Sequence, residues 1–149
     1  MYATPNCHRC GVTDTLEHAI LDCPTVDNFW NEIQAYVDRI TNKMLTLTTQ
    51  IKLFGKIKTK NDPLGSRTID LVNWTLTLAR WAIHKSNVNY RVQNLTFPRD
   101  TLLREMVKSH LSFQFKLYMS RHTQYHLPFH WCLGEAFAKV ENGSLVFTM

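Results

Sequence analysis

The chain has 149 residues and a hydrophobic fraction of 44%, which supplies a core for one domain, or for a small finger and one domain, and excludes a disordered tail. No apolar run reaches the roughly 18 residues of a membrane-spanning helix, so we expect no membrane association. The net charge of +5 combines −3 over residues 1–50 with +8 over residues 51–149, so attraction to phosphate groups is expected in the later part.

Three cysteines and one histidine form the first motif, Cys-x2-Cys-x7-His-x4-Cys, made by Cys7, Cys10, His18 and Cys23. A tight Cys-x2-Cys turn followed by a His and a Cys is typical of a tetrahedral zinc site. Four protein ligands leave no open position for water, so the predicted Zn²⁺ is structural and not catalytic. The alternative is a disulfide pair or unligated thiols, which leaves His18 without a role. His8 is a rival ligand that would strain the turn.

A short helix is expected to carry His18, with Thr13 or Asp14 as its N-cap. Pro24 would stop this helix directly after Cys23, because proline cannot continue the hydrogen-bond ladder. The residues expected to turn inward are Leu16, Ile20 and Leu21.

Thr25 is expected to cap a second helix, whose apolar residues recur at helical spacing to about residue 40. These residues are Val26, Phe29, Trp30, Ile33, Val37 and Ile40. We assign residues 1–41 to a zinc finger with its following helix.

Residues 7–30 carry a family resemblance. The matching residues are Cys7-x2-Cys10, Thr15-x-Glu17-His18-x2-Leu21-x-Cys23-Pro24 and Phe29-Trp30. This string resembles the CCHC zinc-binding region that follows the reverse transcriptase domain in LINE-like (non-LTR) retrotransposon proteins, and residues 74–85 look more weakly like the helix that often follows. The resemblance implies a segment that helps a reverse transcriptase hold its RNA template or DNA target.

Polymerase activity is not expected, because the chain has no Tyr-x-Asp-Asp and no adjacent Asp-Asp to hold two divalent ions. It also has no Gly-x-Ser-x-Gly, no His-Glu-x-x-His and no Walker loop, so we expect neither an enzyme nor a small-molecule substrate. The chain could be a fragment, a separately expressed remnant or a host gene derived from such an element.

Residues 42–65 are assigned to a basic connector that ends in a turn at residues 61–65. Phe54 and Ile57 alternate there with Lys52, Lys56, Lys58 and Lys60. We expect a strand and loop that meet a nucleic-acid backbone, with an ordinary solvated loop as the alternative.

Residues 66–149 are assigned to a helical domain, which begins with a long helix capped by Ser66 and running to about Ser86. One apolar stripe consists of Ile69, Val72, Leu76, Ala79 and Ile83, and a second of Leu71, Trp74, Leu78 and Trp81. Two stripes indicate a central helix buried on both faces, with a partner surface on the second stripe as the alternative. The polar residues 87–96 are expected to form a connection.

Pro98 suits the first turn of another helix, which is expected to run to about Arg121. Its core face is predicted to consist of Leu102, Met106, Phe113 and Leu117. Its basic residues Arg99, Arg104, Lys108 and Lys116 are the second candidate for nucleic-acid contact, with a solvated outer face as the alternative.

The last residues contain His122, His126 and His130 near Cys132. A second metal site is conceivable there, but Pro128 interrupts any helix that would align the histidines, so surface or stacking histidines are expected. Residues 137–140 and 145–147 are expected to pair as a short β-hairpin around Glu141–Ser144 and to pack on the helices.

The sequence therefore predicts a mainly α fold with a CCHC finger and a short C-terminal hairpin. The predicted function is non-catalytic binding of RNA or DNA. The alternative is a zinc-scaffolded protein-interaction module of the same origin, with a partner on the helical half. Cysteines that bind metal suit a reducing compartment, so we expect an intracellular protein, nuclear or cytoplasmic.

Overall fold

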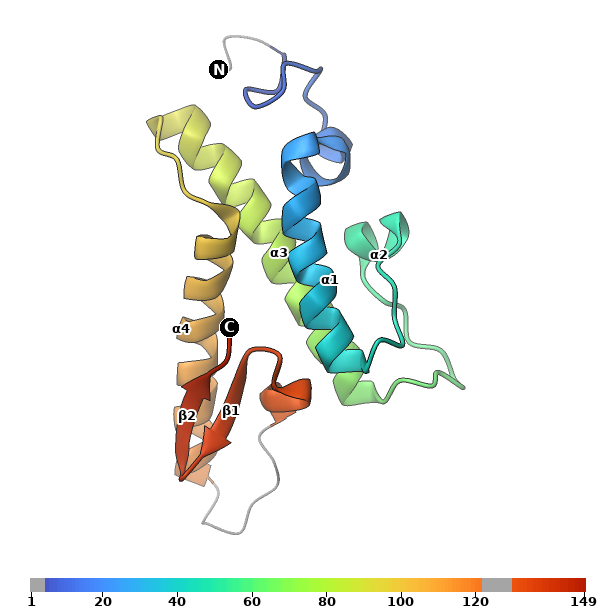
Figure 1. Cartoon of the computed structure of the whole chain (residues 1–149), viewed down its shortest axis with the longest axis vertical. Helices are drawn as coiled ribbons and strands as arrows, with labels where there is room; N and C mark the ends of the chain where they lie inside the picture. The colour runs from blue at the N-terminus through green and yellow to red at the C-terminus, as the bar shows by residue number, and fades with distance from the viewer. Residues whose placement is uncertain (1–4, 122–129) are drawn as a thin grey trace.

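The structure is a computed structural model that describes residues 5–121 and 130–149. It confirms the mainly α fold with a C-terminal hairpin (Figure 1). The α-helices are α1 (Asp27–Thr41), α2 (Thr49–Phe54), α3 (Ser66–Gln93) and α4 (Arg99–Arg121), and the strands are β1 (Ala138–Glu141) and β2 (Ser144–Phe147). Shorter helical turns span His18–Asp22, Pro24–Val26 and His130–Glu135. No helix in the described ranges is long and apolar enough to cross a membrane.

Helix α1 buries the apolar face that its sequence predicts. Phe29, Trp30, Ile33, Val37 and Ile40 are all buried. Asp27 in the first turn and Arg39 in the last suit the helix dipole. The expected cap was wrong, because Val26 occupies the N-cap position and Thr25 lies in a preceding 3₁₀ turn.

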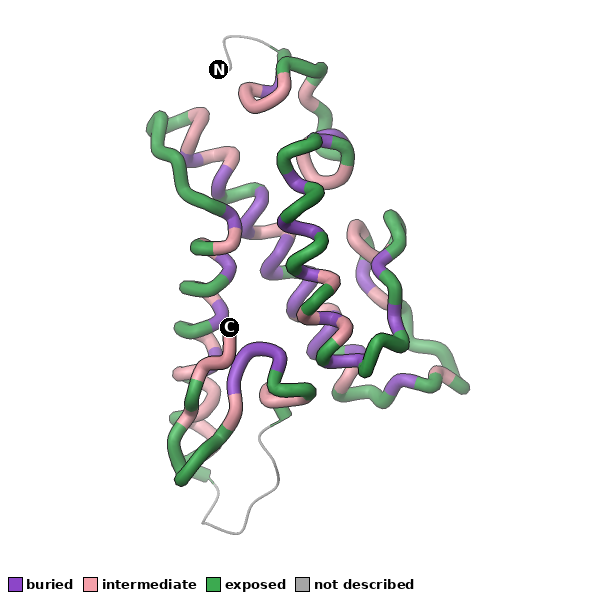
Figure 2. Tube along the Cα trace, in the orientation of Figure 1, coloured by how far each residue is buried: buried purple, intermediate pink, exposed green. Residues whose placement is uncertain are grey.

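Helix α3 is central, as both of its apolar stripes predicted, because it contacts α1 and α4. Leu71 and Leu78 of the second stripe are buried within the chain, and Trp74 and Trp81 pack against the core. Figure 2 shows buried residues along the facing sides of α1, α3 and α4.

Two boundaries of α3 differ from the prediction. Gly65 occupies the N-cap position, so Ser66 is the first helical residue and not the cap. The helix also continues to Gln93, where Asn94 in the left-handed conformation (φ 54°) ends it. The predicted connection was too long because the last turns are held by polar contacts, with Asn89 buried, and not by an apolar stripe.

The predicted core face of α4 was wrong by about one residue. Leu103, Val107 and Leu111 are buried, whereas Phe113 is 59% exposed. Leu102 and Met106 are half-buried at the edge of the core. Adjacent apolar pairs such as Met106 and Val107 make two helix faces look equivalent in sequence, and only packing on α3 chooses between them.

The hairpin forms as predicted, with Ala138 opposite Phe147 and Glu141 opposite Ser144. Asn142 and Gly143 supply the positive φ angles of its tight turn. The fully buried Phe137 precedes β1 and packs against Tyr36 and Trp74, which attaches the hairpin to α1 and α3.

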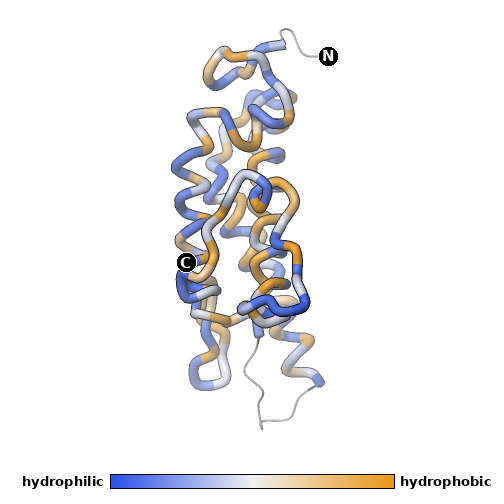
Figure 3. Tube along the Cα trace, turned by 90° about the vertical axis from the view of Figure 1, so that its right-hand side faces the viewer, coloured by the Kyte–Doolittle hydropathy of each residue, from blue (hydrophilic) through white to orange (hydrophobic). Residues whose placement is uncertain are grey.

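One hydrophobic core cluster includes residues from Cys7 in the amino-terminal turn to Ala138 in β1. The loop between α2 and α3 projects from this core, and Figure 3 turns that side of the molecule toward the viewer. The amino-terminal turn and the hairpin lie at opposite ends of the helical layer (Figure 1).

Candidate metal centre and its surroundings

The structure brings together the four predicted metal ligands. One ligand atom from each of Cys7, Cys10, His18 and Cys23 lies within 4.8 Å of all the others. The Sγ atom of Cys23 is 3.9 Å from those of Cys7 and Cys10, and Cys10 Sγ is 3.1 Å from His18 Nε2. Tetrahedral geometry with metal–sulfur bonds of about 2.3 Å separates two sulfurs by about 3.8 Å. The cluster can therefore hold a metal ion. The four cysteines of the chain are all free, which excludes the disulfide alternative in this structure.

A tight turn presents the first two ligands. The Cys7 backbone amide donates to the carbonyl of Val12, and the Gly11 amide donates to the carbonyl of Cys7. Gly11 adopts a φ of 78°, which suits glycine because it has no Cβ. A β-bridge between Asn6 and Thr13 closes the loop. The turn therefore fixes Cys7 and Cys10 on one side of the centre.

A single π-helical turn presents His18, which is buried. The predicted caps Thr13 and Asp14 are wrong, because the hydroxyl of Thr15 accepts from the His18 backbone amide. Leu16 is also not turned inward, since it is 76% exposed. Ile20 packs against the core as predicted.

Polar groups around Cys7 and Cys23 favour the thiolate forms of these two ligands. A backbone hydrogen bond from Val12 acts to lower the pKa of Cys10, but burial and the neighbouring Cys7 and Cys23 outweigh it and raise that pKa. Burial raises the pKa of Cys7, but hydrogen bonds from the backbone of Arg9 and Cys10 outweigh it and lower the pKa below the ordinary value. Burial likewise acts against Cys23, whose pKa is lowered by its contact with Thr25, and the Thr25 hydroxyl lies 3.1 Å from the Cys23 sulfur. A thiolate is the form that binds metal.

Arg99 supports this centre from α4 and does not share the exposed outer face of Arg104, Lys108 and Lys116. It is only 9% exposed, and its guanidinium donates to the Thr25 carbonyl at 2.6 Å and to the Thr25 hydroxyl at 3.1 Å. Burial and the charge of Arg9 lower its pKa to about 10, against an opposite effect of Cys7 and Cys23. Sequence analysis missed both Thr25 and Arg99 as supports. The sequence held one signal for this support, because Thr25 lies two residues after the ligand Cys23.

The amino-terminal turn docks on the last turns of α3. Arg9 donates to the Ser86 hydroxyl at 2.8 Å and to the Asn87 side chain at 3.3 Å. Asp14 forms an ion pair with Arg91. These contacts explain why the polar end of α3 stays helical.

His8 is not part of the four-ligand cluster. Its ring stacks on Tyr90 with centroids 4.2 Å apart, and the Arg91 guanidinium donates to its Nδ1 atom at 3.4 Å. His8 is therefore a contact between the turn and α3, and the rival-ligand alternative does not fit.

The predicted basic connector takes a different form, because Lys52 lies in α2 and not in a strand. Its ammonium group lies 5.4 Å from the Trp30 ring centre, and Lys56 forms an ion pair with Asp62 at 2.5 Å. Arg80 binds the carbonyls at the end of α2, and Asn73 binds both backbone groups of Lys56. The segment is thus anchored on α3.

The outer part of the connector is open to solvent. Lys58 and Lys60 are exposed, although Lys58 donates to the Ser66 hydroxyl. Phe54 is 79% exposed and Ile57 is 77% exposed. On α4, the candidates Arg104, Lys108 and Lys116 are also exposed.

The second conceivable metal site cannot be assembled from described residues, because His122 and His126 lie outside them. His130 contacts the Trp131 ring, with centroids 4.7 Å apart. Burial raises the pKa of Cys132 to about 11, with a smaller contribution from Glu135. Cys132 is therefore a poorly reactive thiol.

Within residues 5–121 and 130–149, no other group of three His, Cys, Asp or Glu side chains is arranged to hold a metal ion. Comparisons with models of known protein families, with curated proteins and with solved structures find no match to this chain.

Proposed function

We propose that the protein is an intracellular, non-catalytic, Zn²⁺-stabilised module that binds RNA or DNA, related by descent to the C-terminal zinc-binding region of LINE-type reverse transcriptases. The sequence motif supports the descent. The chemistry of the donor set supports zinc, because three thiolates and one imidazole in a closed tetrahedral arrangement suit Zn²⁺ and leave no position for a substrate.

One observation carries the nucleic-acid part of the proposal. The connector exposes an aromatic and an aliphatic side chain, Phe54 and Ile57, beside the exposed cations Lys58 and Lys60. Exposed apolar groups of this size are unfavourable in water, and an aromatic ring beside lysines is the combination that holds a base and its phosphate. Lys52 and Lys56 contribute less, because they already contact Trp30 and Asp62.

The test is binding of the zinc-loaded chain to labelled single-stranded RNA, single-stranded DNA and duplex DNA over a salt series. We expect affinity to fall steeply with salt, and Lys58→Gln/Lys60→Gln to reduce the slope of log K against log salt by about two. The matched control is Arg39→Gln/Lys85→Gln, which removes two exposed charges on α1 and α3. No binding at moderate salt would reject the proposal, and equal effects of the two double variants would remove the connector from it.

The alternative is a protein-interaction module with a partner on the second apolar stripe of α3. It has less support, because Trp74 of that stripe packs inside the chain against His110, Trp131 and Phe137. A molecular mass that increases with protein concentration, together with no affinity for nucleic acid, would favour this alternative.

A further inference from the structure

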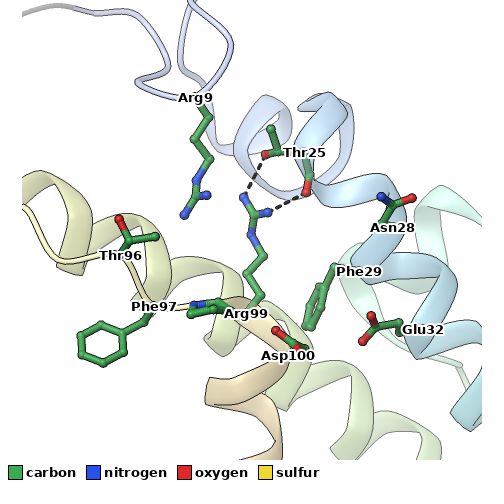
Figure 4. Close-up of a pocket in the computed structure, with 10 residues that line it drawn as sticks. Arg9, Thr25, Asn28, Phe29, Glu32, Thr96, Phe97, Arg99 and Asp100 are labelled. Atoms are coloured by element: carbon green, nitrogen blue, oxygen red, sulfur yellow. Dashed lines mark hydrogen bonds between the residues drawn. The ribbon is translucent and has the colours of Figure 1, made fainter.

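A small cavity lies between the amino-terminal turn, the start of α1 and the start of α4. Its volume is about 240 Å³, which is below the roughly 300–1,000 Å³ of drug-sized ligand sites. A small polar group fits such a space better than a whole cofactor. Figure 4 shows Arg9 and Arg99 pointing toward one another beside Thr25, from elements that are far apart in the sequence.

The two guanidinium groups have spare hydrogen-bond donors. Each guanidinium carries five N–H groups. The contacts of Arg9 are to Ser86 and Asn87, and those of Arg99 are to Thr25, so all of these acceptors are neutral. The Nε atom of Arg99 is fully buried and has no partner in the described structure. A buried cation is costly unless its donors and its charge are satisfied.

The guanidinium end of this cavity lacks a paired anion within the described part of the chain. Arg9 and Arg99 place two positive charges at this end. Neither arginine forms an ion pair with a carboxylate of the described residues. Glu32 and Asp100 line the cavity, but Figure 4 shows them apart from both guanidinium ends, on the α1 and α4 side. An anion beside the arginines would supply the acceptor that the buried Nε atom of Arg99 lacks.

We propose that this cavity binds one phosphate group of a single-stranded nucleic acid, held between Arg9 and Arg99. A phosphodiester carries a charge of −1 and matches the donor geometry of guanidinium. Phe97 lines the same cavity and exposes part of its ring on the outer side, where the neighbouring base can stack. A duplex keeps its bases paired and cannot use this ring, so the site selects a single strand.

The site rests on the proposed function, and Arg9→Gln tests it. Glutamine removes the charge but can still donate to Ser86 or Asn87. In zinc-loaded protein we expect about 10-fold weaker binding of a labelled 12-nucleotide single-stranded RNA, and a salt slope reduced by about one. Phe97→Leu should weaken binding of the single-stranded RNA and leave binding of a duplex unchanged. The matched control is Arg39→Gln, an exposed charge on α1, and Arg9→Lys should recover part of the affinity. Zinc content of each variant is measured alongside.

The outcomes separate the two proposals. RNA binding by the unaltered protein that Arg9→Gln leaves unchanged would overturn the cavity site and leave the connector as the interface. A phosphate titration of the unaltered protein, followed by the ¹⁵Nε signals of its arginines, covers the case in which Arg9→Gln does not hold zinc. Shifts of the Arg9 and Arg99 signals would support the phosphate site. If the protein shows these shifts but does not bind RNA, the ligand of the site is free phosphate and not a nucleic acid. No shift and no RNA binding would overturn the site and the proposed function together.

Discussion

Gly134 lies in the turn before β1, with a φ of 63°, against the end of α1. A Cβ atom there would meet the carbonyl oxygen of Arg39 at 2.0 Å, and backbone cannot move aside as a side chain can. We expect Gly134→Ala to lower the free energy of unfolding by about 3 kcal/mol or more, measured by chemical denaturation.

Gly143 is the control for this prediction, because it has a similar φ of 74° but open space around the position of a Cβ. Gly143→Ala should cost only the left-handed backbone conformation, about 1 kcal/mol. Equal losses in the two variants would show that backbone conformation, and not contact with α1, is what requires Gly134.

We expect His110 to make the stability of the protein depend on pH. Burial lowers its pKa below 6.5, because the ring packs against Trp74 and Trp131 and its Nε2 atom is buried without a partner in the described structure. The unfolded chain therefore binds a proton more readily. The stability from neutral His110 is complete above about pH 6.5 and is lost as the pH falls through the folded-state pKa.

His110→Phe should remove this dependence. The difference in unfolding free energy between the two zinc-loaded proteins is expected to be constant from about pH 8 to pH 6.5, and to shift toward the variant below that. The comparison cancels the acid sensitivity of the metal centre, which both proteins share. A constant difference down to about pH 5 would contradict the burial of this ring.

At the scale of elements, the metal centre and the end of α3 are one unit. The amino-terminal turn contacts α3 through Arg9, His8 and the pair Asp14–Arg91. We expect zinc removal, or Cys10→Ser, to unfold residues 5–40 and also to expose the backbone of residues 86–93, because metal binding supplies folding energy there. Hydrogen exchange with and without chelator measures this.

Cys132→Ser is the matched control, since this thiol lies outside the four-ligand cluster. Its helical spectrum and melting temperature should stay close to those of the unaltered protein. Unchanged exchange at residues 86–93 after zinc removal would mean that α3 holds its own last turns.

Local pattern predicted most of these elements. The spacing of Cys7, Cys10, His18 and Cys23 identified the cluster, because three cysteines and a histidine at this spacing are typical of a metal site. The face of α1 followed from 3.6-residue periodicity. The end of α3 was missed because hydrogen bonds from Arg9, 77 residues away along the chain, hold it. The burial of Arg99 could not be predicted from the sequence either, because a cation at the start of a helix normally faces water.

At the scale of the whole molecule, Phe137 closes the core at the end opposite the metal centre. Its fully buried ring packs against Tyr36 and Trp74. We expect Phe137→Ala to cost about 3–5 kcal/mol of unfolding free energy, while the folded fraction keeps its zinc. Val146→Ala, on the outer part of β2, should cost less than about 1 kcal/mol. A large loss of zinc affinity in Phe137→Ala would show that the two ends are coupled.

Because the pKa of Cys132 is raised, the rate at which the cysteines are alkylated can report how much metal the protein holds. At neutral pH a thiol with a pKa of about 11 reacts slowly with alkylating reagents, and thiolates bound to metal are protected. Each rapidly alkylated sulfur therefore reports a vacated ligand position, and mass spectrometry of labelled protein counts occupancy one molecule at a time. Full release of the ion should add three labels, on Cys7, Cys10 and Cys23, with Cys132 following later.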